Sequence, residues 1–352
     1  MTLIASCKPN GNDTSSTGGQ LSRSSVSTYK NSIGCDTSSW WNSQYTLRMS
    51  INVKAPAESS ITRGYPVSFR IDHKLMVDSG ISHTTGKDFR IVYMDPYCRF
   101  HEVPRIVHPS SQWSRGDTSI WFPVPQKIEA GQDIQGVFAY FRNPNADFVQ
   151  VPMDSIFDDF ENFNSPPAEG RFKIFNHGQA VSYQQGALSL TTPAVPLDKL
   201  GPFGLKRNKR FGSGIAVETS LSIVDFAEVG WTISMGQRQE DFRFKDNRLY
   251  LVVKEGEKES LEELSGQIFS AETSYFVRIE FWSLNDSSIL RVNGRNIAKK
   301  NRPPIEFEPV FSLSPSSIAP KTSFHFHYYL ARKIQEHDDE IEVSLGAAHG
   351  FN

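Results

Sequence analysis

The chain has 352 residues, 38% hydrophobic and 22% charged, with 37 Lys and Arg against 39 Asp and Glu. This length predicts two domains, each able to bury its own core. The formal net charge of -2 argues against a nucleic-acid partner, which needs an excess of basic residues. No apolar run approaches the ~20 residues of a transmembrane helix.

The three cysteines exclude a disulfide-rich scaffold and a four-thiolate zinc site. Cys35 and Cys98 would form a disulfide only in an oxidising compartment, and the sequence leaves their pairing open. Cys7 ends the run Ile4-Ala5-Ser6-Cys7, which has the form of a bacterial lipobox, although only six residues precede Cys7. Cys7 is therefore either a lipidation site or a chance match.

Residues 1–39 contain many Ser, Thr and Gly residues and few large apolar side chains. Such a segment cannot bury enough surface to offset the entropy of ordering. We expect a flexible tether, which fits a lipid anchor at Cys7 but also fits an ordinary disordered tail.

Residues 40–152 show the alternation of short, half-buried strands. Apolar side chains recur at every second position from Tyr45 to Val53, and the same pattern returns at 67–71 and at 89–93. Turn-forming residues separate these runs. The pattern predicts a β-sandwich.

The stretch from Thr118 to Phe160 marks the end of this domain. An aromatic strand that ends at Pro125, a turn at Gly131 and a second aromatic strand that ends at Pro144 predict a hairpin. The Asp158–Asp159 pair then begins a new region.

Several motifs in this region occur in a characteristic order: Gly86-Lys87-Asp88-Phe89-Arg90, Trp121-Phe122-Pro123-Val124-Pro125, and Tyr140-Phe141-Arg142-Asn143-Pro144-Asn145-Ala146. Residues 40–150 thus resemble a bacterial and archaeal domain of unknown function. That domain occurs in proteins that carry concanavalin-A-like lectin domains or MotA/TolQ/ExbB-type proton channels. Where the family usually has Gly, this chain has Arg142. The resemblance implies no catalytic residues.

Residues 153–352 again contain alternating runs. The runs 275–282 and 289–295, the second with an Asn293-Gly294 turn, resemble the hairpin of concanavalin-A-like jelly rolls. We expect an all-β protein of two tandem sandwiches, the second a jelly roll. Runs 324–330 and 341–345 would close the second sandwich, and only 197–206 and 257–264 suit short helices.

Two polar segments suggest chemistry. The run from Glu336 to Glu340 has a Glu-x-Asp-x-Glu spacing that one jelly-roll glycosidase family uses on a strand, but polar His337 and Asp339 intervene and favour a charged turn. His325 and His327 share a strand face and would begin a metal site, although a plain polar face explains them as well.

Two further candidates concern ligands. Asp158 and Asp159 offer oxygen ligands for calcium as a cofactor, and a solvated strand end is the alternative. Trp113 lies in a polar loop and is the best candidate for stacking on a sugar, whereas Trp231 and Trp282 lie in strands and suit the core.

No catalytic constellation is evident in the sequence. We therefore predict a non-enzymatic protein of the cell envelope, outer membrane or cell surface, which recognises a glycan or polysaccharide through the jelly roll. One alternative is a lipoprotein subunit of an envelope assembly, such as a TolQ/ExbB-type channel complex or a surface appendage, that uses both sandwiches for contacts with envelope protein partners. A glycosidase based on Glu336 is the third hypothesis.

Overall fold

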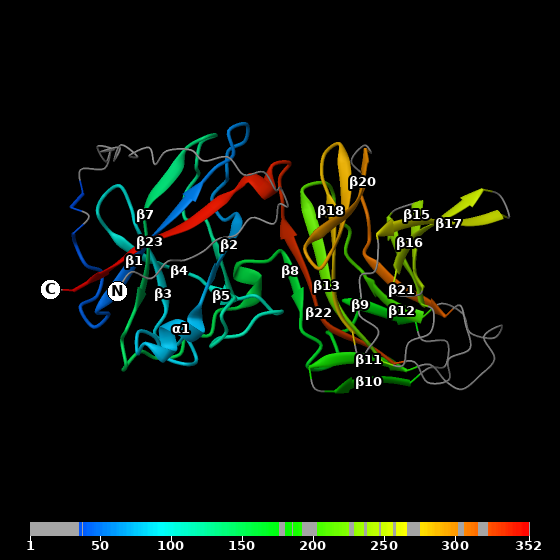
Figure 1. The fold of residues 1–352 in the computed structure, drawn as a ribbon, viewed down its shortest axis with the longest axis horizontal. Coiled ribbons are helices and arrows are strands. Elements are labelled where there is room, and N and C mark those ends of the chain that lie inside the picture. The colour runs from blue at the N-terminus through cyan, green and yellow to red at the C-terminus, as the bar shows by residue number, and fades with distance from the viewer. Residues whose placement is uncertain are drawn as a thin grey trace, which may run out of the picture. The chain divides into compact units, whose positions relative to one another are not determined.

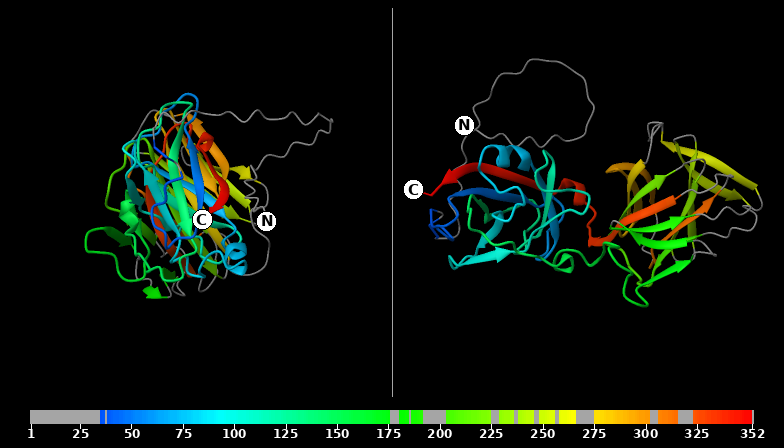
Figure 2. Two further views of the ribbon diagram at one scale, coloured as in Figure 1. Left: turned by 90° about the vertical axis from the view of Figure 1, so that its left-hand side faces the viewer. Right: turned by 90° about the horizontal axis from the view of Figure 1, so that it is seen from below.

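The structure is a computed structural model that describes residues 35–36, 38–175, 180–184, 186–191, 203–224, 229–235, 238–245, 248–255, 258–265, 275–301, 306–315 and 323–351. Within these residues the protein is almost entirely β-structure (Figures 1 and 2). None of the described helices is long and apolar enough to cross a bilayer. The predicted all-β class is confirmed.

The chain forms two compact units, and the second is inserted into the first. The first unit comprises 1–152 together with 339–352, and the second comprises 153–338. The predicted boundary after residue 152 coincides with this division. The prediction that the chain's last residues belong to the jelly roll is wrong, because they return to the first unit.

The first unit is a two-layered sandwich. A five-stranded sheet has the order β23-β1-β7-β3-β4, and a three-stranded sheet has the order β2-β6-β5. The elements are β1 (Leu47–Lys54), β2 (Pro66–Ile71), α1 (His73–Asp78), β3 (Arg90–Met94), β4 (Phe100–Val103), β5 (Ile106–Val107), β6 (Thr118–Pro123), β7 (Asp133–Phe141) and β23 (Glu342–Gly350).

Strand β23 joins the edge of the five-stranded sheet from the far end of the sequence. Leu47 of β1 lies opposite Gly350, and Lys54 lies opposite Glu342. Figure 1 shows the red β23 beside the blue β1, and Figure 2 shows the same neighbours from below. The sheet therefore consists of segments that are almost 300 residues apart in the chain.

The core of the first unit lies between its two sheets. Alternate residues of β1, including Ile51 and Val53, pack with Phe69 of β2 and Phe122 of β6. The sequence predicted this face of β1 correctly, except that Tyr45 belongs to a second cluster with Val92 and Tyr140 on the opposite side of the sheet. Tyr45 precedes the strand, so the alternation does not extend to it.

The predicted hairpin between the two aromatic strands does not form. Strand β6 pairs with β2 and β5 in one sheet, whereas β7 pairs with β1 and β3 in the other. The nine residues that separate β6 from β7 carry the chain across the sandwich. Pro and Gly end both strands as expected, but those signals are local and do not specify the sheet.

Residues 35–36 and 38–39, which were predicted to belong to the tether, lie among the described residues of the first unit. Cys35 forms a disulfide with Cys98, and their Cα atoms are 5.4 Å apart. Trp40 and Trp41 pack on the second cluster, beside Tyr140. Residues 1–34, which include Cys7, lie outside the described residues.

The second unit contains two larger sheets. One has the order β10-β11-β22-β13-β18-β19-β20 with β8 paired to β22, and the other has the order β17-β16-β15-β14-β21-β12-β9. The elements are η1 (Met153–Ser155), β8 (Asp159–Glu161), β9 (Phe172–Phe175), β10 (Ala180–Gln184), β11 (Ala187–Thr191), β12 (Phe203–Arg207), β13 (Ile215–Val224), β14 (Val229–Met235), β15 (Arg238–Lys245), β16 (Arg248–Glu255), β17 (Lys258–Ser265), β18 (Tyr275–Ser283), β19 (Ser287–Val292), β20 (Arg295–Asn301), β21 (Val310–Pro315), β22 (Ser323–Lys333) and η3 (Asp338–Glu340).

Three predictions about local structure in the second unit have clear outcomes. The Asn293-Gly294 turn joins β19 to β20 with positive φ at both residues, as a tight hairpin of this type requires. The expected helix at 257–264 is strand β17, and the described part of 197–206 belongs to β12. Both segments pair with neighbouring strands, so tertiary pairing overrides their helical propensity.

Candidate functional site

The outer face of the eight-stranded sheet carries a cluster of charged and hydrogen-bonding side chains. Tyr329 of β22 contacts Phe172 of β9, with ring centroids 5.4 Å apart, so its side chain points toward the second sheet. Thr219 of β13 is the register partner of Tyr329 and shares that inner face. Because side chains alternate, Glu218 and Ser220 point to the opposite face.

Two glutamates lie side by side on this outer face. Glu218 of β13 is directly opposite Glu280 of β18, and the two residues are only 4% and 5% exposed. Arg278 lies between the carboxylates: its Nη2 is 3.0 Å from Glu280 Oε1, and its Nε is 3.8 Å from Glu218 Oε1. Burial lowers the pKa of Arg278, but Glu218 and Glu280 outweigh it, and the net shift is upward. The guanidinium is therefore charged and compensates the two buried acids.

Aromatic donors complete the coordination of these carboxylates. The Tyr328 hydroxyl donates a short hydrogen bond to Glu218, and Trp282 Nε1 donates to Glu280 Oε2 at 3.1 Å. The guanidinium carbon atoms of Arg291 and Arg332 lie 4.4 Å and 5.3 Å from the centroid of the Trp282 ring. Trp282 is buried, as the sequence predicted, but it is part of the polar cluster.

A buried hydroxyl in this cluster has no hydrogen-bond partner. Ser220 is fully buried and lies opposite Arg278 on one side and Tyr328 on the other, yet no protein atom bonds to its Oγ. The Nε atom of Arg278 also makes no hydrogen bond. Buried polar atoms are rarely left unpaired in native proteins. Within the described residues, these two atoms are polar groups of the cluster whose hydrogen bonds are not satisfied.

His325 and His327 extend the cluster along β22. His325 Nδ1 is 2.5 Å from Ser189 Oγ, and His327 Nε2 is 2.9 Å from Ser222 Oγ. Burial lowers the pKa of both imidazoles, and the proximity of His325 lowers that of His327 further. Within the described residues no group of three His, Cys, Asp or Glu side chains is arranged to hold a metal. The structure thus places the pair on a polar face, beside Ser189 and Ser222.

This cluster resembles the lining of a polar binding site more than a hydrophobic interface. It combines carboxylates and guanidinium groups with hydroxyls, imidazoles and an indole. Such groups donate and accept hydrogen bonds in fixed directions and suit a ligand that has many hydroxyls. Two neighbouring carboxylates are also the minimum set for acid–base chemistry at a glycosidic bond.

Comparisons with known proteins found similar solved structures but no matching family. No family model and no curated protein matches the chain. Its fold is similar to that of an endo-acting O-glycanase from the human gut microbiota, at 10% identity over 51% of this chain and 99% of the other, with a TM-score of 0.41. A β-glucanase of Bacillus licheniformis matches at 12% identity over 50% and 97%, with a TM-score of 0.38. A galectin-like protein of unknown function from Bacillus subtilis matches at 10% identity over 50% and 94%, with a TM-score of 0.36.

These similarities bear on two predictions. The neighbours support the jelly-roll part of the fold prediction, while the resemblance of residues 40–150 to the domain of unknown function finds no matching family model. The prediction that the protein is not an enzyme is contradicted, because several neighbours are named as glycanases or glucanases. We withdraw that prediction.

Trp113, the predicted sugar-stacking residue, packs against the core of the first unit. Its ring contacts Phe89 at 5.9 Å and His73 at 4.7 Å between centroids. Gly86 approaches the indole so closely that a Cβ at this position would lie 2.4 Å from the ring. The loop composition suggested exposure, but the missing side chain of Gly86 creates a slot that the indole fills. Trp113 is therefore not a free stacking surface.

Asp158 and Asp159 do not form the expected calcium site. Asp159 is buried and pairs with two arginines, at 2.7 Å from Arg171 Nη2 and 2.6 Å from Arg207 Nε. Burial alone would raise the pKa of Asp159, but the bonds from Arg207 and Arg171 lower it. Two cations already compensate this carboxylate, and Asp158 is exposed beside it. The segment resembled a calcium site only in its acidic residues, and not in how their carboxylates are arranged.

The acidic segment near Glu336 forms a turn, which agrees with the charged-turn interpretation. Asp338–Glu340 is a single 3-10 turn, so its carboxylates do not alternate on a strand. Asp338 pairs with Arg332 at 3.1 Å. The glycosidase hypothesis based on Glu336 therefore lacks the geometry that it requires.

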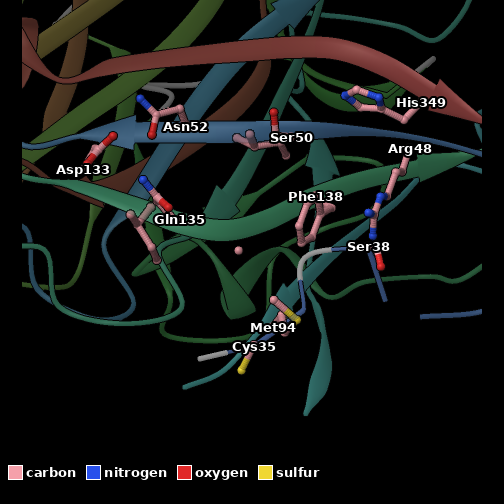
Figure 3. Close-up of a pocket in the computed structure, with 13 residues that line it drawn as sticks. Cys35, Ser38, Arg48, Ser50, Asn52, Met94, Asp133, Gln135, Phe138 and His349 are labelled. Atoms are coloured by element: carbon pink, nitrogen blue, oxygen red, sulfur yellow. The ribbon is translucent and has the colours of Figure 1, made fainter. Parts of the chain in front are cut away.

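A pocket of about 620 Å³ lies on the outer face of the five-stranded sheet in the first unit. Figure 3 shows Arg48, His349 and Phe138 at one end and Asn52, Asp133 and Gln135 at the other. The side chains of Arg48 and Asn52 in this pocket already form contacts within the protein.

Arg48 lies 4.6 Å from the Trp40 ring and 4.7 Å from the Phe138 ring, and it donates to the Ser39 carbonyl at 2.6 Å. The Asn52 amide nitrogen donates to Asp133 at 3.1 Å. The contacts of Arg48 hold Ser39 and Trp40 on the sheet.

The sequence analysis missed Glu218 and Glu280 as site residues. Glu218 lies between Val217 and Thr219, and Glu280 lies between Ile279 and Phe281, in runs that read as strands. The usable signal was an acidic residue in the middle of each of two apolar strands, since an isolated carboxylate is seldom buried. The pairing of β13 with β18 brings the two together, and sequence spacing alone does not show it.

Proposed function

We propose that the second unit binds a glycan on the outer face of the eight-stranded sheet, around Glu218, Ser220, Arg278 and Glu280. The observation that carries this proposal is the buried, unpartnered Ser220 hydroxyl beside an Arg278 Nε that also lacks a hydrogen bond. A sugar hydroxyl is both donor and acceptor and satisfies both atoms. The glycan-related neighbours support this kind of ligand, although they do not identify it.

Ser220→Ala tests the site without disturbing its charges. The variant removes only the hydroxyl that has no partner, so stability is expected to stay level or to rise slightly. Affinity for the glycan that the protein selects from a polysaccharide panel is expected to fall about 2- to 10-fold, the value of one lost hydrogen bond. Ser68→Ala, in β2 of the first unit, is the matched control. Unchanged affinity in Ser220→Ala would refute the site.

Glycoside hydrolysis is a second candidate function, favoured by the direct opposition of Glu218 and Glu280. Residues opposite each other on antiparallel strands have Cβ atoms only about 5 Å apart, and retaining glycosidases hold their carboxyl groups about 5–5.5 Å apart. One of the two must be protonated to act as an acid. Arg278 contacts both carboxylates, so hydrolysis requires the substrate to displace this arginine.

Release of reducing ends from the bound polysaccharide separates the two functions. For a hydrolase, Glu218→Gln and Glu280→Gln abolish release, whereas Ser220→Ala only weakens it. Binding without any release of reducing ends would assign the face to recognition alone. As a control, the circular dichroism spectra of both glutamate variants should match that of the parent protein, which shows that the variants are folded.

We also propose that the protein resides in the cell envelope, with Cys7 as its lipid anchor. The Cys35–Cys98 disulfide supports an oxidising compartment. In cells, Cys7→Ser is expected to move the protein from the membrane fraction to the soluble fraction. An unchanged membrane fraction would refute acylation at Cys7.

A further inference from the structure

The loop between β3 and β4 presents an exposed aromatic side chain. Tyr97, at its tip, is 78% exposed, the largest exposed fraction among the bulky hydrophobic residues that the structure describes. The Arg99 guanidinium carbon lies 5.1 Å from the centroid of the Tyr97 ring. An exposed tyrosine offers an apolar ring together with a polar hydroxyl, the combination favoured at binding surfaces.

Hydrogen bonds and the disulfide hold this loop in one conformation. The Asp95 carboxylate accepts hydrogen bonds from the backbone N–H groups of Tyr97 and Arg99, at 2.8 Å and 3.0 Å. It also contacts Arg99 Nε and His101 Nε2, both at 2.9 Å. Cys98 is bonded to Cys35 next to Tyr97. A loop fixed in this way loses little conformational entropy when a ligand binds.

A pocket of about 690 Å³ adjoins the tyrosine. We call it the Tyr97 pocket. Its apolar walls consist of proline and valine side chains, and its polar groups come from the strand that follows the loop and from the segment after β6. The charged and aromatic lining residues include Arg63, Asp95, Tyr97, Arg99, Glu102 and Lys127.

The Tyr97 pocket has an excess of available positive charge. Its two carboxylates are already paired, Asp95 with Arg99 at 2.8 Å and Glu102 with Arg90 at 3.1 Å. Lys127 pairs only with Glu129, and both side chains are more than half exposed, so this bridge is weak. Arg63 has no ion-pair partner within the part of the chain that the structure describes.

We propose that the Tyr97 pocket binds an acidic sugar of a polysaccharide. The Tyr97 ring stacks on the apolar face of the sugar ring, and Arg63 and Lys127 bind its carboxylate or sulfate group. Neutral sugars satisfy the stacking contact but leave both cations unpaired. This proposal concerns the first unit and stands independently of the glycan site proposed on the second.

Isothermal titration of the full chain with oligogalacturonate, and with its methyl ester, tests the charge requirement. The acid is expected to bind at least about tenfold more tightly than the uncharged ester, and its affinity is expected to fall as salt is added. Alginate and heparin oligosaccharides serve as further acidic probes. Absence of binding to all three acids, or equal binding of acid and ester, would overturn the proposal.

Paired variants locate the site. Tyr97→Ala is expected to weaken binding about tenfold and Tyr97→Phe less than about twofold. Phe148→Ala, which removes another exposed aromatic ring of the same unit, is the matched control. Arg63→Gln is expected to weaken binding, whereas Arg70→Gln, an exposed arginine on β2, leaves it unchanged. Equal effects of Tyr97→Ala and Phe148→Ala would contradict the assignment.

Ser220→Ala distinguishes this site from the one on the second unit. Ser220→Ala is expected to leave oligogalacturonate binding intact. Tyr97→Ala is expected to leave intact the glycan binding of the second unit, which Ser220→Ala weakens. Loss of oligogalacturonate binding in Ser220→Ala would place the acidic-sugar site on the second unit and overturn the Tyr97 proposal.

Discussion

His73 shows how one buried side chain couples the stability of the first unit to pH. Its Nδ1 accepts a hydrogen bond from the Ser114 backbone N–H at 2.8 Å, so the proton of the neutral ring is on Nε2, 3.1 Å from Ser82 Oγ. Ser82 Oγ in turn donates to Asp88 at 3.0 Å. Burial lowers the pKa of His73 to about 4, although Asp88 and Asp72 oppose the shift.

The free energy of unfolding is expected to fall as the pH drops from 6.5 toward about 4. In this window the unfolded chain binds a proton at His73 and the folded chain does not, which costs up to about 3 kcal/mol. Above pH 6.5 both states are neutral at this residue, so its effect vanishes.

Urea denaturation of the parent and of His73→Gln across this window measures the effect. The variant is expected to lose stability more gradually with falling pH, whereas exposed His349→Gln should follow the parent. Identical pH profiles for the parent and His73→Gln would contradict the assignment.

Arg142 occupies a backbone conformation that suits glycine. Its φ angle is +64°, and its N–H donates to Asp88 at 3.1 Å. This left-handed conformation is unfavourable for a residue with a Cβ, because the Cβ comes close to the following carbonyl oxygen. Glycine is expected at this position from a sequence resemblance, and the observed φ angle suits glycine.

Arg142→Gly is expected to stabilise the first unit by about 0.5–1 kcal/mol in thermal or urea unfolding. The side chain of Arg142 is exposed, so its removal costs little. Arg142→Ala separates loss of the side chain from relief of the backbone, because alanine keeps the strain and should leave stability nearly unchanged. A gain in Arg142→Ala equal to that in Arg142→Gly would show that the backbone is not the cause.

At the scale of elements, β8 and β22 close the second unit where the chain enters and leaves it. Asp159 lies opposite Ala331 and Glu161 opposite Tyr329. The carboxylate of Asp159 joins this pair to Arg171 and Arg207 beyond it.

Asp159→Asn is expected to destabilise the second unit by about 3 kcal/mol, because it removes the counter-ion of the largely buried Arg207 and leaves Arg171 with Glu161 alone. The neighbouring Asp158→Asn is a matched control, since Asp158 is exposed, and it should change stability by less than about 0.5 kcal/mol. Chemical denaturation measures both, and equal losses in the two variants would contradict the role of Asp159.

Sequence patterns predicted strands well and their partners poorly. Alternation identified β1, β2 and β3, and the Asn293-Gly294 dipeptide identified a hairpin turn, because both signals are local. The separation of β6 from β7 and the pairing of β23 with β1 depend on contacts between distant segments. The sequence did not predict the candidate site for the same reason. Glu218 and Glu280 become neighbours only when β13 pairs with β18.

At the scale of the whole molecule, the second unit is an insertion whose first and last strands are neighbours. Residues 153–338 are therefore expected to fold alone with a cooperative thermal transition, because the β8–β22 pair holds the two ends together. Residues 35–152 alone are expected to be unstable, since β1 then lacks β23. Adding residues 339–351 through a short linker should restore a cooperative transition.

A failure of residues 153–338 to fold, or full stability of residues 35–152 without β23, would contradict this division of the chain. Circular dichroism melting of the three proteins distinguishes these outcomes. The control is the full chain, in which both transitions are expected.

The late position of β23 has a consequence for synthesis. A ribosome adds about 5–20 residues per second, so the roughly 190 residues of the second unit separate residue 152 from β23 by about 10–40 s. During this interval the nascent first unit displays the unpaired edge of β1, which binds strands of other chains. The second unit is continuous and completes its sheets before the first, so a ribosome that stalls within it leaves an open sheet edge for chaperones to cover.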